Sequence, residues 1–203
     1  MIRNSLLEIL NETWPAIFIC GIVIVTLRLT FLIKNKQKLV LYKELLDLAF
    51  IAYVLCLFYV VTFEDVSWGT SNFIPFKEIF RYQIGSRLFI KNILGNIFMF
   101  MPYGFMVGYY LKLKKPDLAI VLTFIVSLAI ESVQLVIGRV FDIDDILLNL
   151  VGGLVGAYIY TLLYKVESLL PAVLKKEWFY NIIVMIVLLL FALYLFNFIN
   201  LGV

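Results

Sequence analysis

Long, nearly uninterrupted apolar stretches recur along this chain and constrain its fold more than any other feature. A helix needs roughly 20 mostly apolar residues to cross a hydrocarbon core of about 30 Å. Of the 203 residues, 64% are hydrophobic and 15% are charged. A soluble domain could not keep so many apolar residues off its own surface. The stretches are too long and continuous for barrel strands. The sequence therefore predicts an all-α, polytopic transmembrane helical bundle.

Six membrane spans are expected, at residues 13–33, 45–63, 88–111, 118–137, 143–164 and 179–201. The first lacks a basic start and is longer than the core of a typical signal peptide, so we expect it to remain in the protein. The expected organisation is an N-terminal span with a basic loop (1–44), a core (45–165) and a C-terminal span (166–203).

Lysines near the span ends predict the orientation, because cytoplasmic loops are enriched in Lys and Arg. They cluster in alternate loops, which follow the first, third and fifth spans, and the predicted orientation therefore places both termini outside the cell. The net charge of +3 reflects these loops and gives no support for nucleic-acid binding. The lysines are Lys34, Lys36, Lys38, Lys43, Lys112, Lys114, Lys115, Lys165, Lys175 and Lys176.

Polar residues interrupt three successive spans at one expected depth. At 1.5 Å per residue, Glu131 lies about 20 Å along the fourth span, roughly two-thirds of the way to the outer surface. Asn92 and Asn96 lie about 6 and 12 Å below that surface on the third span, and Asn149 is at a similar depth on the fifth. These groups are predicted to share a layer in the outer half of the membrane.

The same residues recur at helical spacing, which predicts polar stripes that face neighbouring helices. A charged side chain facing lipid at mid-depth would cost at least about 2.5–3.5 kcal/mol, so we expect Glu131 to point inward. An ion pair with Arg139 is the structural alternative to a functional role. One stripe contains Thr123, Ser127, Glu131, Gln134 and Gly138; the other contains Asp142, Asp145, Asn149, Gly152 and Gly156.

Residues 139–145 are expected to form a tight external turn with acidic groups at the start of the fifth span. Helix N-termini favour negative charge, and capping would account for one or two of Asp142, Asp144 and Asp145. A third acid beside Arg139 and above Glu131 indicates a charge network at the mouth of a cavity. A solvated turn is the alternative. Gly152 and Gly156 are expected to allow close helix packing.

Two ordered segments resemble the hallmark segments of the VanZ-like family of membrane proteins. They are "NILGNIFMFMPYGF" (92–105) and "ESVQLVIGRVFDIDDILLNLVGGLVG" (131–156), and "NFIPF" (72–76) resembles the short loop motif of the family. The match covers roughly residues 45–165 and leaves out the first and last spans. The matching positions are Asn92, Asn96, Pro102, Gly104, Phe105, Glu131, Gln134, Arg139, Asp142, Asp145, Asn149 and Gly152.

The resemblance implies a multi-pass protein of a bacterial plasma membrane, in particular that of a Gram-positive organism. It also implies a link to resistance against lipid-tailed glycopeptide antibiotics such as teicoplanin, or to cell-envelope homeostasis. The family name describes a phenotype and supplies no reaction.

Two main classes of function remain open. In the first, the polar cluster binds an amphiphile in the outer leaflet: a membrane lipid, a lipoglycopeptide antibiotic or a lipid-linked cell-wall precursor. Arg139, Arg87 or Arg81 would then hold an anionic head. The full set of candidate ligand-binding residues is Asn92, Asn96, Gln134, Arg139, Asn149, Arg87 and Arg81.

In the second class, the cluster belongs to an enzyme whose candidate catalytic residues are Glu131, Asp142 and Asp145. Glu131 would serve as a general acid or base, while Asp142 or Asp145 orients it or positions a metal. The chain has no histidine, which excludes serine–histidine hydrolysis and histidine-containing zinc sites. Carboxylate chemistry with Mg²⁺ or Mn²⁺ stays open, so neither a cofactor nor a metal is assigned. Transport or proton relay is a third, less specific interpretation.

Overall fold

The computed structural model describes the backbone of residues 2–63 and 71–200, and within these the side chains of 7–63, 71–190 and 193. This part of the chain is helical and contains no strand beyond one isolated parallel bridge between Asn72 and Asp142. Its elements are α1 (Ile2–Lys34), α2 (Leu41–Phe63), α3 (Lys77–Arg81), α4 (Arg87–Phe89), the π-helical turn η1 (Ile90–Leu94), α5 (Gly95–Leu111), α6 (Asp117–Val136), α7 (Ile143–Leu169) and α8 (Glu177–Asn200).

Within the described part of the chain, four helices are long and apolar enough to cross a membrane: Leu7–Lys34 within α1, and the whole of α2, α6 and α7. The predicted all-α class is confirmed. The predicted third span is divided at η1, and the side chains of α8 are described continuously only over the apolar stretch Glu177–Leu190. Six crossings and extracellular termini therefore stay predictions.

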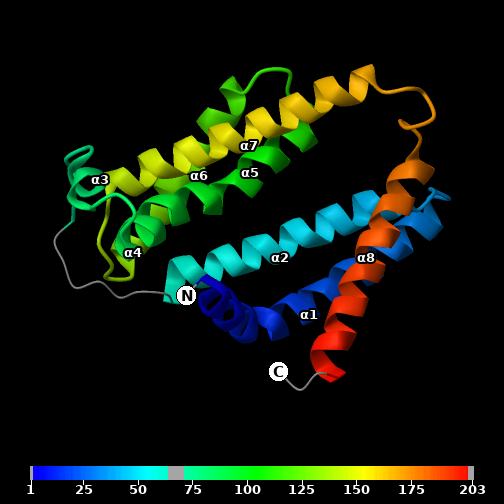
Figure 1. Ribbon diagram of the computed structural model, residues 1–203, viewed down its shortest axis with the longest axis horizontal. Helices are drawn as coiled ribbons and strands as arrows, with labels where there is room; N and C mark the ends of the chain where they lie inside the picture. Colours follow the sequence, from blue (N-terminus) through cyan, green and yellow to red (C-terminus); the bar gives the residue numbers. More distant parts are fainter. Residues whose placement is uncertain (1, 64–70, 201–203) are drawn as a thin grey trace. The chain divides into compact units, whose positions relative to one another are not determined.

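Two compact units divide the chain, and each is described by itself. The first contains residues 1–14 and 53–165, and here α5, α6 and α7 run side by side (Figure 1). Val107, Ala119 and Ala157 form an apolar core between these helices, and Tyr103, Leu113 and Leu122 pack against it. This unit carries every candidate site residue.

Glycines allow the backbones of α5 and α7 to touch, as the sequence predicted for Gly152 and Gly156. A methyl group at Gly152 would overlap the carbonyl oxygen of Ile97, and one at Gly156 would overlap that of Met101. Gly104 faces the carbonyl of Gly153 in the same way. The close approach brings Asn96 on α5 and Asp145 on α7 within reach of each other.

Helix α6 ends just before a glycine that adopts the left-handed backbone conformation. Gly138 has φ of +84°, which a residue without Cβ adopts at little cost. The amide of Arg139 then donates to the carbonyl of Gln134 at 2.8 Å, the long hydrogen bond of a Schellman cap. This cap turns the chain sharply and positions Arg139–Asp142 at the start of α7.

The second unit contains residues 15–52 and 166–203, with parts of α1 and α2 and all of α8. Arg28 forms a two-pronged ion pair with Glu44 at 2.9 and 3.0 Å. Lys43 pairs with Glu177 at 2.9 Å, and the amide of Tyr42 donates to the Asn181 side chain at 3.1 Å. These contacts join the three helices of this unit.

Candidate functional site

Asp142 begins helix α7 as its N-cap residue. Its carboxylate oxygen accepts hydrogen bonds from the amide of Asp144 and from the Asn72 side chain, both at 2.9 Å, and an N-cap carboxylate satisfies an otherwise unpaired helix amide in this way. Burial raises the pKa of Asp142 above its ordinary value, whereas these hydrogen bonds lower it. The predicted capping role of an acid in this turn therefore belongs to Asp142.

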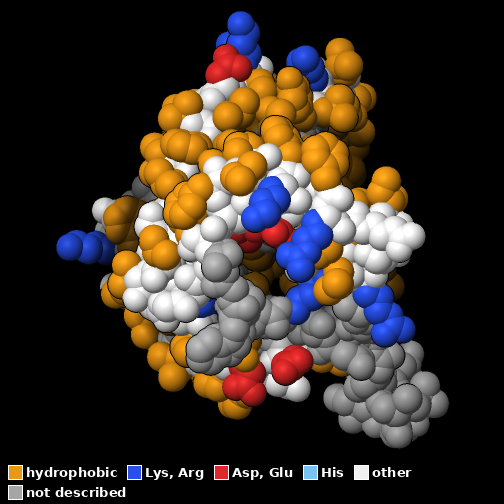
Figure 2. Space-filling view, turned by 90° about the vertical axis from the view of Figure 1, so that its left-hand side faces the viewer, with side chains coloured by type: hydrophobic (Ala, Val, Ile, Leu, Met, Phe, Trp, Pro, Cys, Tyr) orange, Lys and Arg blue, Asp and Glu red, His pale blue; other side chains and the backbone are white. Residues whose placement is uncertain are grey.

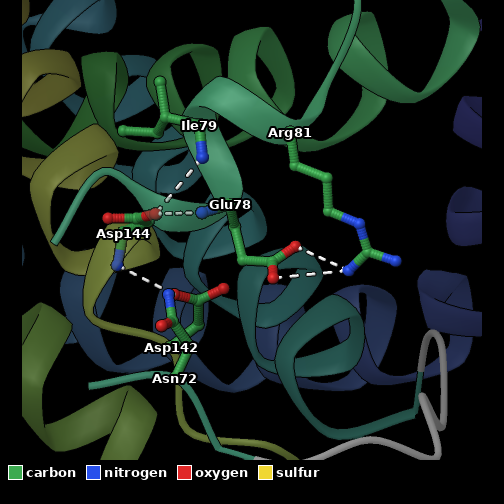
Figure 3. A network of polar contacts seen from close by, with 6 residues as sticks. All are labelled: Asn72, Glu78, Ile79, Arg81, Asp142 and Asp144. Carbon is green, nitrogen blue, oxygen red and sulfur yellow. Dashed lines mark hydrogen bonds and ion pairs between the residues drawn. The ribbon is translucent and has the colours of Figure 1, made fainter. Parts of the chain in front are cut away.

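Asp144 does not cap its own helix and instead holds a distant loop. Its side chain is 1% exposed and accepts the backbone amides of Phe76, Glu78 (2.7 Å) and Ile79 (3.2 Å) at the start of α3. Figure 3 shows the carboxylate facing the amides of Glu78 and Ile79. Charge-assisted bonds to several amides make this a strong clamp.

A backbone bridge reinforces the clamp. The amide of Asn72 donates to Phe141 at 2.8 Å, and the amide of Ile143 donates to Asn72 at 3.0 Å. The Asn72 side-chain oxygen also accepts the amide of Ile74 at 3.1 Å. The "NFIPF" segment is thereby fixed against the start of α7.

Glu131 is buried on α6, as its position inside a polar stripe predicted. It is 2% exposed, and its carboxylate accepts the amide of Asp142 at 2.9 Å. The stripe continues with Ser127, whose hydroxyl accepts the side-chain amide of Asn149 at 2.9 Å. Polar groups of α6 and α7 therefore meet inside the bundle.

The third helix joins this layer through Asn96, whose side-chain amide donates to the carboxylate of Asp145 at 2.6 Å. The expected meeting of α5, α6 and α7 is thus present at Asn96, Asp145, Asn149 and Glu131. Asn92 lies in the π-helical turn and contacts the Tyr82 hydroxyl. Burial raises the pKa of Tyr82, which the Asn92 hydrogen bond opposes. π-Helical turns are often found at functional sites.

Arg139 and Gln134 face the end of α2. Arg139 donates to the carbonyl oxygen of Val61 at 2.6 Å, and Gln134 is 3.4 Å from the same oxygen. Cations near a helix C-terminus neutralise its partial negative charge. None of the ion pairs among the described residues joins Glu131 to Arg139, so the structural pair considered from the sequence is absent there.

The other two candidate arginines lie on the segment that Asp144 holds. Arg81 forms an ion pair with Glu78 at 3.1 Å on α3, as Figure 3 shows. Arg87 is exposed at the start of α4. Among the described residues, neither arginine forms a hydrogen bond or an ion pair with the buried acids.

No group of three or more Asp, Glu or Cys side chains in the described ranges is arranged to hold a metal ion. The acids instead use amides as partners. Two buried atoms, the Thr123 hydroxyl and the Asn149 side-chain oxygen, have no hydrogen-bond partner within the described part of the chain. Groups of this kind in a packed interior commonly bind water.

An apolar groove lies elsewhere, in the second unit, between α1 and α2. It encloses about 450 Å³ and is lined by residues such as Phe18, Gly21 and Ile51. Its lining carries almost no polar surface, so it differs in kind from the predicted polar site.

The long apolar helices and the buried polar layer define the class: an α-helical membrane protein with acids and amides gathered at one end of its core helices. The sequence pattern of the VanZ/LLP1 family matches residues 50–164, more than half of the chain. The chain belongs to this family. Searches of curated proteins and of solved structures gave no match.

Three residues of the site were not among the predicted ones: Asn72, Tyr82 and Asp144. The "NFIPF" motif and the third acid of the turn were the available signals. Neither signal shows that the two segments contact each other, because helical spacing indicates which face of a helix a residue lies on and not which residue it contacts.

Proposed function

We propose that this chain is a bacterial plasma-membrane protein that binds the polar head of an amphiphile at Glu131, Asp145 and their amide neighbours. The candidate amphiphiles are a lipoglycopeptide antibiotic of the teicoplanin type and a lipid-linked cell-wall precursor. Through this binding the protein would contribute to resistance or to envelope homeostasis, as the family resemblance implies.

One observation carries the proposal: the buried carboxylate of Glu131 and the partly buried carboxylate of Asp145 have unused hydrogen-bonding capacity. Glu131 accepts one amide and Asp145 accepts one side-chain amide from the described residues, and neither pairs with a described Lys or Arg. An ionised carboxylate offers about four acceptor positions, and leaving a buried charge unpaired is costly. A ligand that brings ammonium, amide or hydroxyl donors would satisfy them.

The charges around the site favour a different ligand head from the anionic one expected from the sequence. Arg139 directs one guanidinium nitrogen, Nη1, to the carbonyls of Val60 and Val61 at the end of α2, whereas the polar layer between α5, α6 and α7 contains the acids Glu131 and Asp145. We therefore favour a head with hydrogen-bond donors or a positive charge over a purely anionic head. The apolar tail would lie in the surrounding lipid.

The test compares ligand binding by purified protein in lipid nanodiscs using native mass spectrometry. A lipid-tailed glycopeptide and a lipid-linked precursor are added separately, with a glycopeptide lacking the tail as the matched ligand control. Glu131→Gln and Asp145→Asn should each lose binding at least about tenfold, because a charge-assisted hydrogen bond contributes about 1.5–3 kcal/mol. Asp117→Asn, an exposed acid at the opposite end of α6, should bind like the wild type.

The outcome separates the possibilities clearly. Equal binding by wild type, Glu131→Gln and Asp145→Asn would refute the site. In cells, the same two variants should lose any resistance while reaching the membrane at normal abundance.

A carboxylate-dependent enzyme is a second candidate, because Glu131 accepts the amide of Asp142 and Asp145 follows one helical turn later on α7. Two coupled carboxylates can divide the roles of general acid and base. The same nanodisc experiment distinguishes the two: an added lipid that is retained unchanged supports binding, whereas a mass change that requires Glu131 supports catalysis.

A further inference from the structure

The described segment 71–91, which leads into α5, carries large apolar side chains that stay mostly exposed within its own unit. Phe80 is 83% exposed and Ile84 is 87% exposed. Phe73, Phe76 and Leu88 are also more than half exposed. Such a concentration of exposed apolar groups on one short segment marks an interaction surface.

The backbone of this segment excludes a position in the hydrocarbon core. It contains only the five residues of α3 and the three of α4 before η1, with left-handed residues at Phe76 and Gly85. Unpaired amides and carbonyls between these short helices need water or polar partners, and lipid-exposed irregular backbone does not occur at hydrocarbon depth. The segment therefore belongs at the membrane surface, where apolar side chains can reach the acyl boundary.

Its charge is strongly basic. Residues 71–91 contain four Lys or Arg and one Glu, and Lys77, Arg81 and Arg87 are exposed. Figure 2, which faces this end of the structure, shows Lys and Arg side chains beside hydrophobic ones, with acidic side chains set back between them. Basic and apolar groups together on a surface element are typical of attachment to anionic lipids.

The segment is also held in place. The Asp144 clamp and the Asn72 bridge fix its first part to α7, and α4 continues without a break through η1 into α5. Because its two ends are anchored to α7 and α5, the segment presents its basic groups in a fixed arrangement, which lowers the entropy cost of binding.

We propose that residues 73–91 form an interfacial anchor that inserts Phe80 and Ile84 at the acyl boundary and binds anionic phospholipid headgroups through Lys77, Arg81 and Arg87. The anchor goes beyond the proposed function, because it needs no ligand at Glu131 or Asp145. Its partner is the phospholipid of the membrane in which the chain resides.

The experiment measures the depth of a spin label at residue 84 by electron paramagnetic resonance. Ile84→Cys is made in full-length protein with Cys20→Ala and Cys56→Ala, and labelled protein is placed in zwitterionic or phosphatidylglycerol-rich vesicles. Labels at Lys114→Cys, in an exposed loop, and at Ile125→Cys, an exposed position near the middle of α6, give the aqueous and hydrocarbon references. The label at residue 84 should read between the two and move deeper in anionic vesicles.

A matched pair of charge variants tests the headgroup contacts. K77Q/R87Q should abolish the shift caused by phosphatidylglycerol, since each removed charge weakens attraction to an anionic surface about fivefold. K114Q/K115Q, which removes the same charge from another exposed loop, should retain it. Unchanged helical content and Glu131-dependent ligand binding would show that the fold and the buried cluster are intact.

Three results would overturn the anchor. The label could read as fully aqueous in both kinds of vesicle; the K114Q/K115Q variant could lose the shift as K77Q/R87Q does; or inorganic phosphate in solution could remove the shift, which would indicate a free-anion site. None of these results bears on the acidic cluster, whose ligands are measured separately.

Discussion

The side-chain amide of Asn96 on α5 donates a 2.6 Å hydrogen bond to the carboxylate of Asp145 on α7. This bond joins the two segments that carry the family resemblance, and it is possible because glycines let the two helix backbones touch. The polar layer and the close packing are therefore one arrangement: without the glycines, Asn96 would not reach Asp145.

Asn96→Ala should destabilise the protein by about 1.5–3 kcal/mol, the usual contribution of a hydrogen bond to a charged group. The reason is that Asp145 would lose the donor that its partly buried carboxylate uses. Thermal unfolding in detergent measures the change. Asn11→Ala, at an exposed position of α1, is the control and should unfold like the wild type; equal unfolding of both variants would contradict the importance of the bond.

Asp144→Ala should release the loop at α3, because three backbone amides would lose their common acceptor. Limited trypsin digestion measures this directly, since Lys77 and Arg81 lie within the held segment. Cleavage there should accelerate at least about tenfold, given about 1.5–3 kcal/mol for each charge-assisted bond. Asp144→Asn, which keeps one oxygen acceptor, should be cleaved at an intermediate rate. Asp117→Ala should be cleaved at the rate of the wild type. Unchanged cleavage in Asp144→Ala would show that the clamp does not hold the loop.

Much of the fold follows from the sequence because hydrophobic length and helical spacing are local properties. The start of α7 at Ile143 and the inward direction of Glu131 were both predicted in this way. Glu131 could be placed because an ionisable residue inside an apolar run has few alternatives to a buried, hydrogen-bonded position.

The partners of the polar residues were not predictable on the same basis. Asp144 binds amides 65 to 68 residues earlier in the chain, and Arg139 binds carbonyls at the end of α2. Both pairings depend on how elements pack in three dimensions. The π-helical turn at Asn92 was also missed, because its apolar pattern is that of an ordinary helix.

Gly104→Ala should destabilise the bundle by about 1–3 kcal/mol, the usual cost of overpacking a tight contact. A methyl group there would overlap the backbone of Gly153 on α7, and backbone cannot move aside as a flexible side chain can. Thermal unfolding measures the effect. Gly21→Ala is the matched control, because a methyl group at Gly21 meets nothing within 4 Å, and helix propensity alone favours alanine. A stabilised Gly104→Ala variant would refute the tight contact.

The stability difference between the wild type and Asp142→Asn should depend on pH. Burial, together with the negative charges of Asp144 and Glu78, raises the pKa of Asp142 despite the opposing hydrogen bonds from Asp144 and Asn72. A carboxyl group with a raised pKa binds its proton more tightly in the folded state. Its contribution to folding stability is therefore complete below the unfolded pKa of about 3.9, and it is lost as the pH rises through the folded pKa. The melting temperature of the wild type minus that of Asp142→Asn should therefore increase as the pH falls from 7 toward 4. Asp117→Asn measures the effect of removing an exposed carboxylate from the same helical bundle. A difference for Asp142→Asn that shrinks on acidification would show that the carboxylate of Asp142 is favoured, and not disfavoured, by its surroundings.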